Sequence, residues 1–238
     1  ILPKLSNVTR LLKFELPSVN LIPDVFLEPT IEYEELPETI QQKIKKTYVN
    51  KIIKDIHSTI WIATSKGLYK VTEHNFEHLL KGNSITTTQN FYNKLLIGTN
   101  SELYKIDESG NHQFLLNSAV NAIASNKSNQ IFVGSDSNIF VLDSLKVVDT
   151  LNVKGKISKI LIKKEKVWVA TTTNGIFSFS YDIKTGSIFN SIHFDESEGI
   201  YDLNIVDMQV DRLGRFWYVS QKGFLGIIDK NVVKHLGK

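Results

Sequence analysis

One stretch of the sequence has the residue types and spacing of a zinc site. It reads His74-Asn75-Phe76-Glu77-His78, and an H-x-x-E-H string on a helix would place both imidazoles on one face, with the glutamate as general base. The stretch falls, however, at the outer-strand position of a repeated β pattern, where residues four apart lie too far apart to share one metal ion. We therefore expect an exposed polar strand here and no metal centre.

The remaining groups that could do chemistry do not form a catalytic set. Cysteine is absent, which removes thiol nucleophiles, zinc-thiolate sites and disulfides. The other histidines have no equivalents in the repeats, so we expect surface or hydrogen-bonded roles for His57, His112, His193 and His235. The carboxylates that recur at the ends of strands fit turn capping better than acid or base catalysis; they are Asp107, Asp143 and Asp229. The sequence thus predicts no catalytic residue and no cofactor.

The dominant feature of the chain is a repeat. The stretch IWIATSKGLYKV at residues 60–71 is restated four times, in copies that begin at residues 95, 131, 167 and 216. Successive units are therefore 35, 36, 36 and 49 residues apart. A period near 36 with several short strands per unit is typical of β-propeller blades.

Each unit contains the pattern of four strands. The first strands are predicted at residues 49–55, 84–90, 119–125, 157–163 and 205–211. The near-continuous apolar strand of the repeat follows, then a strand after a Thr/Ser-x-x-Gly turn. Weaker outer strands are predicted at residues 76–80, 113–116, 147–153, 188–194 and 232–236. The predicted fold is all-β, a β-propeller of four-stranded antiparallel blades with five visible repeats.

One position of the second strand carries a large apolar residue in every unit. A small sheet cannot bury both faces alone, so packing against its neighbours must cover them. We predict that these residues are wedges between blades: Trp61, Leu96, Phe132, Trp168 and Trp217. The following turns carry Gly67, Gly175 and Gly223, which suits a positive φ, whereas Glu102 and Asn138 stand at that place in the second and third units.

Residues 1–46 form a lead-in without a visible repeat, and residues 47–238 carry the propeller repeats. All five prolines lie within the first 37 residues, and proline is confined to strand edges and turns because it cannot donate to a ladder. A short helix is predicted after Pro37, at residues 38–46. Five blades can close a ring; alternatively, the lead-in completes a sixth, degenerate blade, or the five units belong to a larger ring.

The units resemble the two-component regulator propeller repeat. Residues 211–217, DRLGRFW, match its turn and Trp strand, and residues 95–99 and 103–107 match the rest of its L-W-I-G-T-x-x-G-L-Y-x-Y-D pattern. The resemblance covers residues 47–229. It implies the periplasmic sensor region of hybrid histidine kinases of Bacteroidetes-type bacteria, many of which respond to oligosaccharides. Similar repeats in cell-surface proteins and secretion accessory factors imply an alternative, a cell-envelope scaffold that acts by protein–protein interaction.

Composition narrows the partners. The net charge is only +3, and arginine occurs at three positions, Arg10, Arg212 and Arg215, whereas nucleic-acid binders concentrate basic residues and favour arginine. No apolar run approaches the roughly 18 residues of a membrane span. We therefore expect no nucleic-acid partner and no membrane span in this chain, and the resemblance implies a periplasmic or cell-envelope location.

A ligand would bind at the turns that follow the second and fourth strands. The candidate side chains there are Lys66, Asn100, Glu102, Asp136, Asn138, Asn174, Lys222 and Tyr201. Such an amide-rich rim suits a polar ligand such as an oligosaccharide, through hydrogen bonds and stacking on Tyr201. Tyr201 belongs to an acidic insertion at residues 195–202, which lacks the spacing of an EF-hand calcium loop.

Three functions are compatible with this pattern. The first is a non-enzymatic sensor or recognition propeller, and the second is the protein-docking scaffold, with a protein partner or a homodimer. A propeller lyase similar in outline to the streptogramin-type lyases is the third, but the sequence shows no convergent His/Glu set for it.

Overall fold

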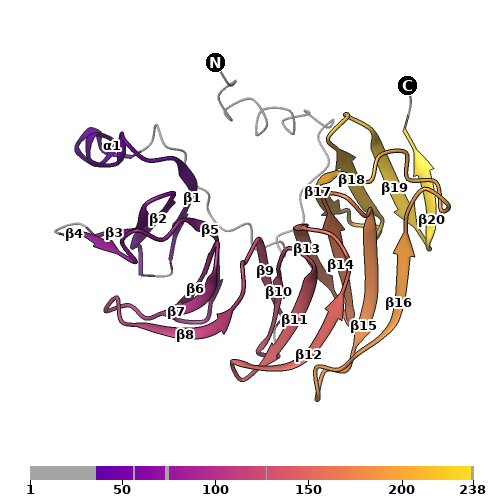
Figure 1. Ribbon diagram of the computed structural model, residues 1–238, viewed down its shortest axis with the longest axis horizontal. Helices are drawn as coiled ribbons and strands as arrows, with labels where there is room; N and C mark the ends of the chain where they lie inside the picture. The colour runs from indigo at the N-terminus through magenta and orange to yellow at the C-terminus, as the bar shows by residue number, and fades with distance from the viewer. Residues whose placement is uncertain (1–35, 56, 73–74, 127, 237–238) are drawn as a thin grey trace.

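The computed structural model describes residues 36–55, 57–72, 75–126 and 128–236. In this part of the chain, five four-stranded antiparallel sheets follow one another, each with its strands in chain order (Figure 1). We number these sheets blade 1 to blade 5. The predicted all-β fold of four-stranded antiparallel propeller blades is confirmed.

Each blade is a meander in which every strand pairs with its neighbours along the chain. Blade 1 contains β1 (Val49–Lys54), β2 (Ile60–Thr64), β3 (Gly67–Val71) and β4 (Phe76–Leu79). Blade 2 contains β5 (Ile85–Phe91), β6 (Lys94–Thr99), β7 (Glu102–Ile106) and β8 (His112–Asn117). Blade 3 contains β9 (Ala122–Ser125), β10 (Gln130–Gly134), β11 (Asn138–Asp143) and β12 (Lys146–Asn152). Blade 4 contains β13 (Ile157–Lys163), β14 (Lys166–Thr171), β15 (Ile176–Tyr181) and β16 (Ile188–Phe194). Blade 5 contains β17 (Ile205–Val210), β18 (Phe216–Ser220), β19 (Leu225–Asp229) and β20 (Val232–His235).

The predicted strands agree with these bounds to within a residue or two, except at the start of blade 3. There β9 begins at Ala122 and not at residue 119. Upstream of Ala122, Val120 donates to the carbonyl of Thr99 in blade 2 at 2.9 Å and so leaves the ladder of blade 3, whereas Asn121 still donates to the carbonyl of Gly134 in β10 at 2.7 Å.

The blades are arranged in an arc. The first strands of successive blades contact one another on its concave side, from β1 through β5, β9 and β13 to β17. Blades 1 and 5 stand at the two ends of the arc, and no described strand bridges them (Figure 1). The described blades therefore form part of a propeller ring without closing it.

The helix α1 (Glu38–Ile44) covers the face of blade 1 that has no neighbouring blade. Ile40 and Ile44 are buried against Ile62 and Tyr69 of that blade. The predicted helix after Pro37 is confirmed, although it ends at Ile44, two residues early. The rest of the predicted lead-in, residues 1–35, lies outside the described residues.

The predicted wedges separate the blades. Trp61, Leu96, Phe132 and Trp168 are at most 3% exposed, and each packs in a cluster with residues of the next blade. Trp168 stacks on Phe216 of blade 5, with ring centroids 3.8 Å apart. Trp217 has the same position in blade 5 but is only half-buried, because no described blade follows it.

A small residue stands two positions after each wedge in blades 1 to 4: Ala63, Gly98, Gly134 and Ala170. These residues lie on the wedge face of their strand, where the next blade comes closest. A Cβ atom on Gly134 would lie 2.5 Å from Cγ2 of Ile157, the first residue of blade 4. The small residue therefore sets how closely two blades approach.

Side chains at β-bulges link successive blades on the concave side. A register shift near the start of β1, β5, β13 and β17 leaves one residue out of the ladder in each strand. In blade 1, Asn50 Nδ2 donates to the carbonyl of Ile85 at 2.6 Å. In blade 4, Ser158 Oγ donates to the carbonyl of Ile205, also at 2.6 Å. The bulges thus direct polar side chains at the next blade and fasten it.

Candidate functional site

The turns between the second and third strands are fixed by a buried hydroxyl. Thr64 Oγ1 donates to the carbonyl of Gly67 at 2.8 Å, and Thr171 Oγ1 donates to that of Gly175 at 3.0 Å. Thr99 and Ser135 do the same in blades 2 and 3. Because all five sheets have one strand order, these turns lie at the same edge of the blades. The sequence predicts a ligand rim at this edge but not the role of these hydroxyls. The feature that indicates them is the Thr or Ser residue at the end of each second strand.

Glycine is required at this turn in some blades only. Gly67 has φ of 137° and Gly175 has φ of 68°, and a Cβ on Gly175 would lie 2.3 Å from the carbonyl oxygen of Phe194. Glu102 and Asn138 have no positive φ, so their turns close on ordinary backbone geometry. The departure from the repeat at these two positions is therefore a difference in turn type and causes no strain.

Five of the eight predicted site residues are exposed at this rim. They are Lys66, Asn100, Asp136, Lys222 and Tyr201, whereas Glu102, Asn138 and Asn174 are half-buried. No hydrogen bond in the described part of the chain joins one of the eight side chains to another. The structure thus places the eight residues along one edge, where Glu102, Asp136, Asn138, Asn174 and Tyr201 are held by contacts within their own blade or with the preceding one.

In blade 2 the carboxylate of Glu102 accepts a hydrogen bond from the hydroxyl of Tyr104. This hydrogen bond, with some burial, raises the pKa of Tyr104 above its ordinary value. The pair is an acceptor group held in place at the rim of blade 2.

In blade 3 two amide side chains hold the rim residues. Asn121 Nδ2 donates to Asp136 at 2.9 Å, and Asn152 Nδ2 donates to Asn138 Oδ1 at 3.0 Å. In blade 4, Asn174 Nδ2 donates to the carbonyl of Val153 at 2.8 Å, so it joins blades 3 and 4. Asn138 and Asn174 therefore have a positioning role as well as rim exposure.

Histidines on the outer strands brace the same turns. His78 of β4 stacks on Tyr69 with ring centroids 4.1 Å apart, and its Nε2 lies 3.0 Å from the carbonyl of Lys66. His193 of β16 stacks on Phe177 at 4.1 Å, and its Nε2 lies 2.8 Å from the carbonyl of Asn174. Since a carbonyl oxygen only accepts, Nε2 carries the proton in both residues.

His235 of β20 has the same place in blade 5, where it bonds to the carbonyl of Gly199. Blade 5 has Gly226 in β19 where blades 1 and 4 have Tyr69 and Phe177. Its ring partner comes instead from the insertion: Tyr201 stacks on His235 with centroids 3.7 Å apart. The prediction that His193 and His235 lack equivalents is therefore wrong, because the equivalence lies in the pairing register of weakly patterned outer strands.

The H-x-x-E-H stretch is strand and not helix over its described part. Phe76, Glu77 and His78 belong to β4, and His78 is committed to Tyr69 and the rim turn. His74 lies outside the described residues. Among the residues that the structure does describe, no group of three or more His, Asp or Glu side chains could hold a metal ion.

The acidic insertion is stabilised by its own hydrogen bonds. Asp195 accepts from the N–H and hydroxyl of Ser197, both at 2.7 Å, which lowers the pKa of Asp195. Burial opposes ionisation of Asp202, but the N–H groups of Lys222 and Asn204 outweigh it and hold its pKa below the ordinary value. The insertion is therefore tied to the β18–β19 turn, which brings Tyr201 and Lys222 to the same blade edge.

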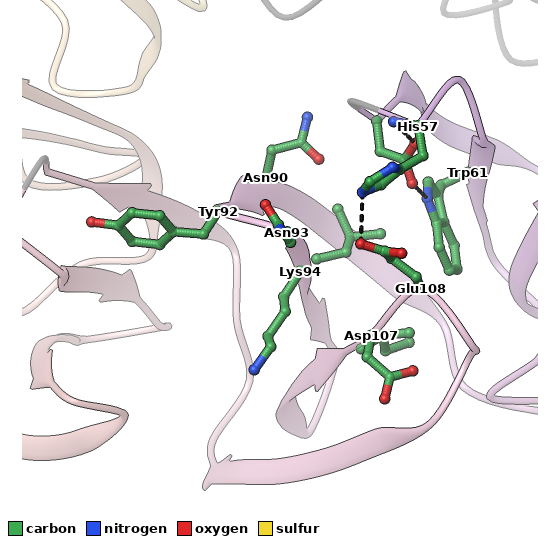
Figure 2. A pocket seen from close by; sticks show the side chains of 11 residues that line it. His57, Trp61, Asn90, Tyr92, Asn93, Lys94, Asp107 and Glu108 are labelled. Atoms are coloured by element: carbon green, nitrogen blue, oxygen red, sulfur yellow. Dashed lines mark hydrogen bonds and ion pairs between the residues drawn. The ribbon is translucent and has the colours of Figure 1, made fainter.

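At the opposite edge, side chains of blades 1 and 2 line a small hollow (Figure 2). Trp61 Nε1 donates to Asp55 at 2.8 Å, and His57 Nε2 lies 2.6 Å from Glu108. About 10 Å³ is left, which holds one water molecule at most. The predicted hydrogen-bonded role of His57 is confirmed, and this hollow is too small for a ligand.

No protein-family model and no curated protein matches the sequence. Solved structures do match. The extracellular domain of the hybrid two-component system BT3049 from B. thetaiotaomicron aligns with a TM-score of 0.63 at 16% identity, over 79% of this chain and 28% of that one. Inactive H270A virginiamycin B lyase from Staphylococcus aureus aligns with a TM-score of 0.64 at 14% identity, over 81% of this chain and 70% of that one. PorZ, a surface component of the type-IX secretion system of Porphyromonas gingivalis, aligns with a TM-score of 0.59 at 14% identity, over 74% and 31%.

At these identities the matches establish the propeller fold and nothing finer. The chain spans 28% of the length of the two-component extracellular domain. No helix in the described ranges is long and apolar enough to cross a membrane.

Proposed function

We propose that this protein is a non-enzymatic recognition propeller that serves as part of the extracellular or periplasmic sensor region of a two-component system. The observation that carries the proposal is the rim: turns at one edge of the blades present polar groups, of which Glu102, Asp136, Asn138 and Asn174 are held by hydrogen bonds before any ligand arrives. Such preorganisation lowers the entropy cost of binding. The fold shared with the extracellular domain of a hybrid two-component system supports the same reading.

The rim chemistry favours a polar, sugar-like ligand. Lys66 and Lys222 supply donors, Asp136 supplies an acceptor, and Tyr201 keeps 63% of its surface exposed although one face stacks on His235. Hydrogen-bond donors and acceptors beside an exposed aromatic face are the groups that recognise an oligosaccharide. Binding across two blades would favour one relative packing of those blades over others, which is how the signal would leave the domain.

A second function, docking of a protein partner, is favoured by one observation. The rim of blade 5 carries Tyr201 beside Phe224, which is 37% exposed, and Leu225, which is 40% exposed. An aromatic and aliphatic cluster of this kind suits a protein partner or a second copy better than a sugar alone. PorZ, which acts in a secretion system, has the same fold.

The two functions are separated by a matched pair of substitutions. Tyr201 and Tyr92 are 63% and 62% exposed but lie at opposite edges of the blades. In a thermal-shift screen of oligosaccharides, we expect Tyr201→Asn to abolish the shift that a bound sugar produces and Tyr92→Asn to keep it. A screen without any shift, together with capture of one stable protein partner that Tyr201→Asn releases, would favour docking. Turnover in a glycan or lactone screen, lost on a rim substitution, would overturn the non-enzymatic proposal.

A further inference from the structure

One position of the repeat has opposite charge in different blades. In blade 1, Trp61 Nε1 donates to Asp55 Oδ2 at 2.8 Å, and in blade 5, Trp217 Nε1 donates to Asp211 Oδ2 at 3.0 Å. In both blades the aspartate comes two residues after the cross-strand partner of the tryptophan. The same register in blade 4 leads from Trp168 through Leu161 to Lys163. A cation stands where the other two tryptophans have a carboxylate.

The charge reversal leaves the indole N–H of Trp168 without an acceptor. Trp168 is 3% exposed, and its Nε1 is buried with no hydrogen-bond partner among the described residues. Lys163 extends past it, because Lys163 Nζ donates to the carbonyl of Asp211 in blade 5 at 3.2 Å. A buried donor without an acceptor is costly to the fold, so an acceptor that reaches this N–H would be bound favourably.

The space beside Trp168 is large enough for such an acceptor. A hollow of about 280 Å³ opens between blades 4 and 5, whereas the hollow at the same place between blades 1 and 2 has about 10 Å³ (Figure 2). Trp168, Phe216 and Ser180 line it together with the β13–β14 turn. The volume is near the lower end of small-molecule sites, roughly 300 Å³, which fits a ligand of monosaccharide size.

The walls of the hollow favour an anion. Lys163, Lys164 and Lys166 line it, and Glu165 is the one acidic side chain among its lining residues. Lys166 Nζ lies 5.1 Å above the ring of Trp168 and 3.3 Å from Asn231 Oδ1. Burial lowers the pKa of Lys166, so a bound negative charge beside it would stabilise its protonated form.

We propose that this hollow binds a small organic carboxylate. The side chains that cover the indole N–H of Trp168 move aside, and a carboxylate oxygen then accepts it in the way that the Asp55 carboxylate accepts that of Trp61. Lys163 and Lys166 supply the neutralising charge, and the stacked rings of Trp168 and Phe216 supply an apolar wall for the body of the ligand. The site lies at the β13–β14 edge, opposite the rim, so it does not depend on the proposed function.

The three tryptophans of the chain make the test specific. In a ¹⁵N-labelled full-length protein, each indole N–H gives one signal, which Trp→Phe variants assign. We expect sodium D-glucuronate to move the Trp168 signal downfield in a saturable way and to leave the Trp61 and Trp217 signals in place, because their acceptors are internal. Uncharged D-glucuronamide at the same concentration should produce no shift.

Two further probes show which part of the ligand the hollow recognises. N-acetylglycine as effective as glucuronate would show that the carboxylate alone is recognised, and glucuronate alone would show that the sugar ring is recognised too; both results support the proposal. An equal effect of sodium sulfate would show general screening of the lysines and would overturn it. A Trp168 signal that glucuronate leaves unmoved would overturn it as well.

Substitutions that change charge equally provide the control. Lys163→Asp places a carboxylate at the register of Asp55, so the Trp168 signal should move without ligand and glucuronate affinity should fall about tenfold or more. Lys184→Asp, in the exposed β15–β16 turn and outside the lining of the hollow, should change the affinity less than about threefold, as expected for a screened surface charge. Glu165→Gln should strengthen binding. Unmoved Trp61 and Trp217 signals in each variant show that the blades are folded. Equal losses in Lys163→Asp and Lys184→Asp would contradict the proposed geometry.

Discussion

The hydroxyl of Ser158 donates a 2.6 Å hydrogen bond to the carbonyl oxygen of Ile205, the first residue of the next blade. Ser158 is the bulged residue of β13, so a local irregularity in one blade directly holds the following one. Val206 is the bulged residue of β17 and has no side-chain donor. The bulge is thus a joint between blades in the interior of the arc.

Ser158→Ala removes this joint and leaves the Ile205 carbonyl without its side-chain donor. We expect a loss of about 1 kcal/mol in the free energy of unfolding, the usual contribution of one part-buried hydrogen bond. Ser109→Ala, in the exposed β7–β8 turn, is the control and should change it by less than about 0.5 kcal/mol. Urea unfolding of both variants gives the comparison, and equal values for the two would show that the joint carries no stability.

Gly134→Ala should destabilise the protein by about 1 to 3 kcal/mol, because the added methyl group would overlap Ile157 across the junction between blades 3 and 4. Ala63 and Ala170 have the same repeat position, so alanine itself suits the strand. In an Ile157→Ala background the clash is relieved, and Gly134→Ala should cost less there. Additive effects in this double-mutant cycle would contradict the close approach of the two blades.

Asp211 makes stability depend on acidity. Burial opposes its ionisation, but hydrogen bonds from Trp217 and Arg215 outweigh it and hold the pKa of Asp211 below its ordinary value of 3.8. A depressed folded-state pKa gives stability that is present above pH about 4 and lost as pH falls through the folded pKa. Asp211→Asn should therefore cost about 1 kcal/mol at pH 7 and flatten the acid limb of the unfolding curve. An Asp211→Asn variant that loses stability in acid as steeply as the parent protein would contradict this role of Asp211.

Tyr218 should show the opposite pH dependence. Burial raises its pKa to about 12, so the unfolded chain releases this proton first, and stability should fall as pH rises from about 10 to 12. Its hydroxyl is buried without a hydrogen-bond partner among the described residues. Tyr218→Phe should therefore leave the melting temperature at pH 7 unchanged or raise it, and it should weaken the alkaline loss of stability. A lowered melting temperature at pH 7 would mean that the hydroxyl is hydrogen-bonded.

The fold could be predicted because its signal is repeated five times. The same position of the second strand faces the next blade in four blades, at Trp61, Leu96, Phe132 and Trp168. Their strands are apolar at nearly every position because both faces are buried. The rim turns followed from the same register. In each of these cases one local pattern determines one local structure.

What the sequence did not reveal depends on contacts between segments that are far apart. His235 lies 34 residues from Tyr201, and their stacking replaces the ring that Gly226 cannot provide. The orphaned N–H of Trp168 was equally hidden, since it follows from the pairing of Trp168 with Leu161 and the turn geometry that puts Lys163 beyond it. A sequence alignment of the repeats shows the residues that the blades share. The Tyr201–His235 stacking and the unpaired N–H of Trp168 are differences between blades, and they become visible only from the pairing register of the strands.

The helix α1 makes the two ends of the arc unlike each other. A row of units that touch only their neighbours loses cooperativity first at an end whose last unit has no neighbour. Blade 1 is shielded by Ile40 and Ile44, while blade 5 turns the half-buried Trp217 outward in the described part of the chain. The rate of amide hydrogen exchange should accordingly be highest in β17–β20 and should decrease toward β1. Local unfolding would then begin at blade 5 and proceed toward blade 1.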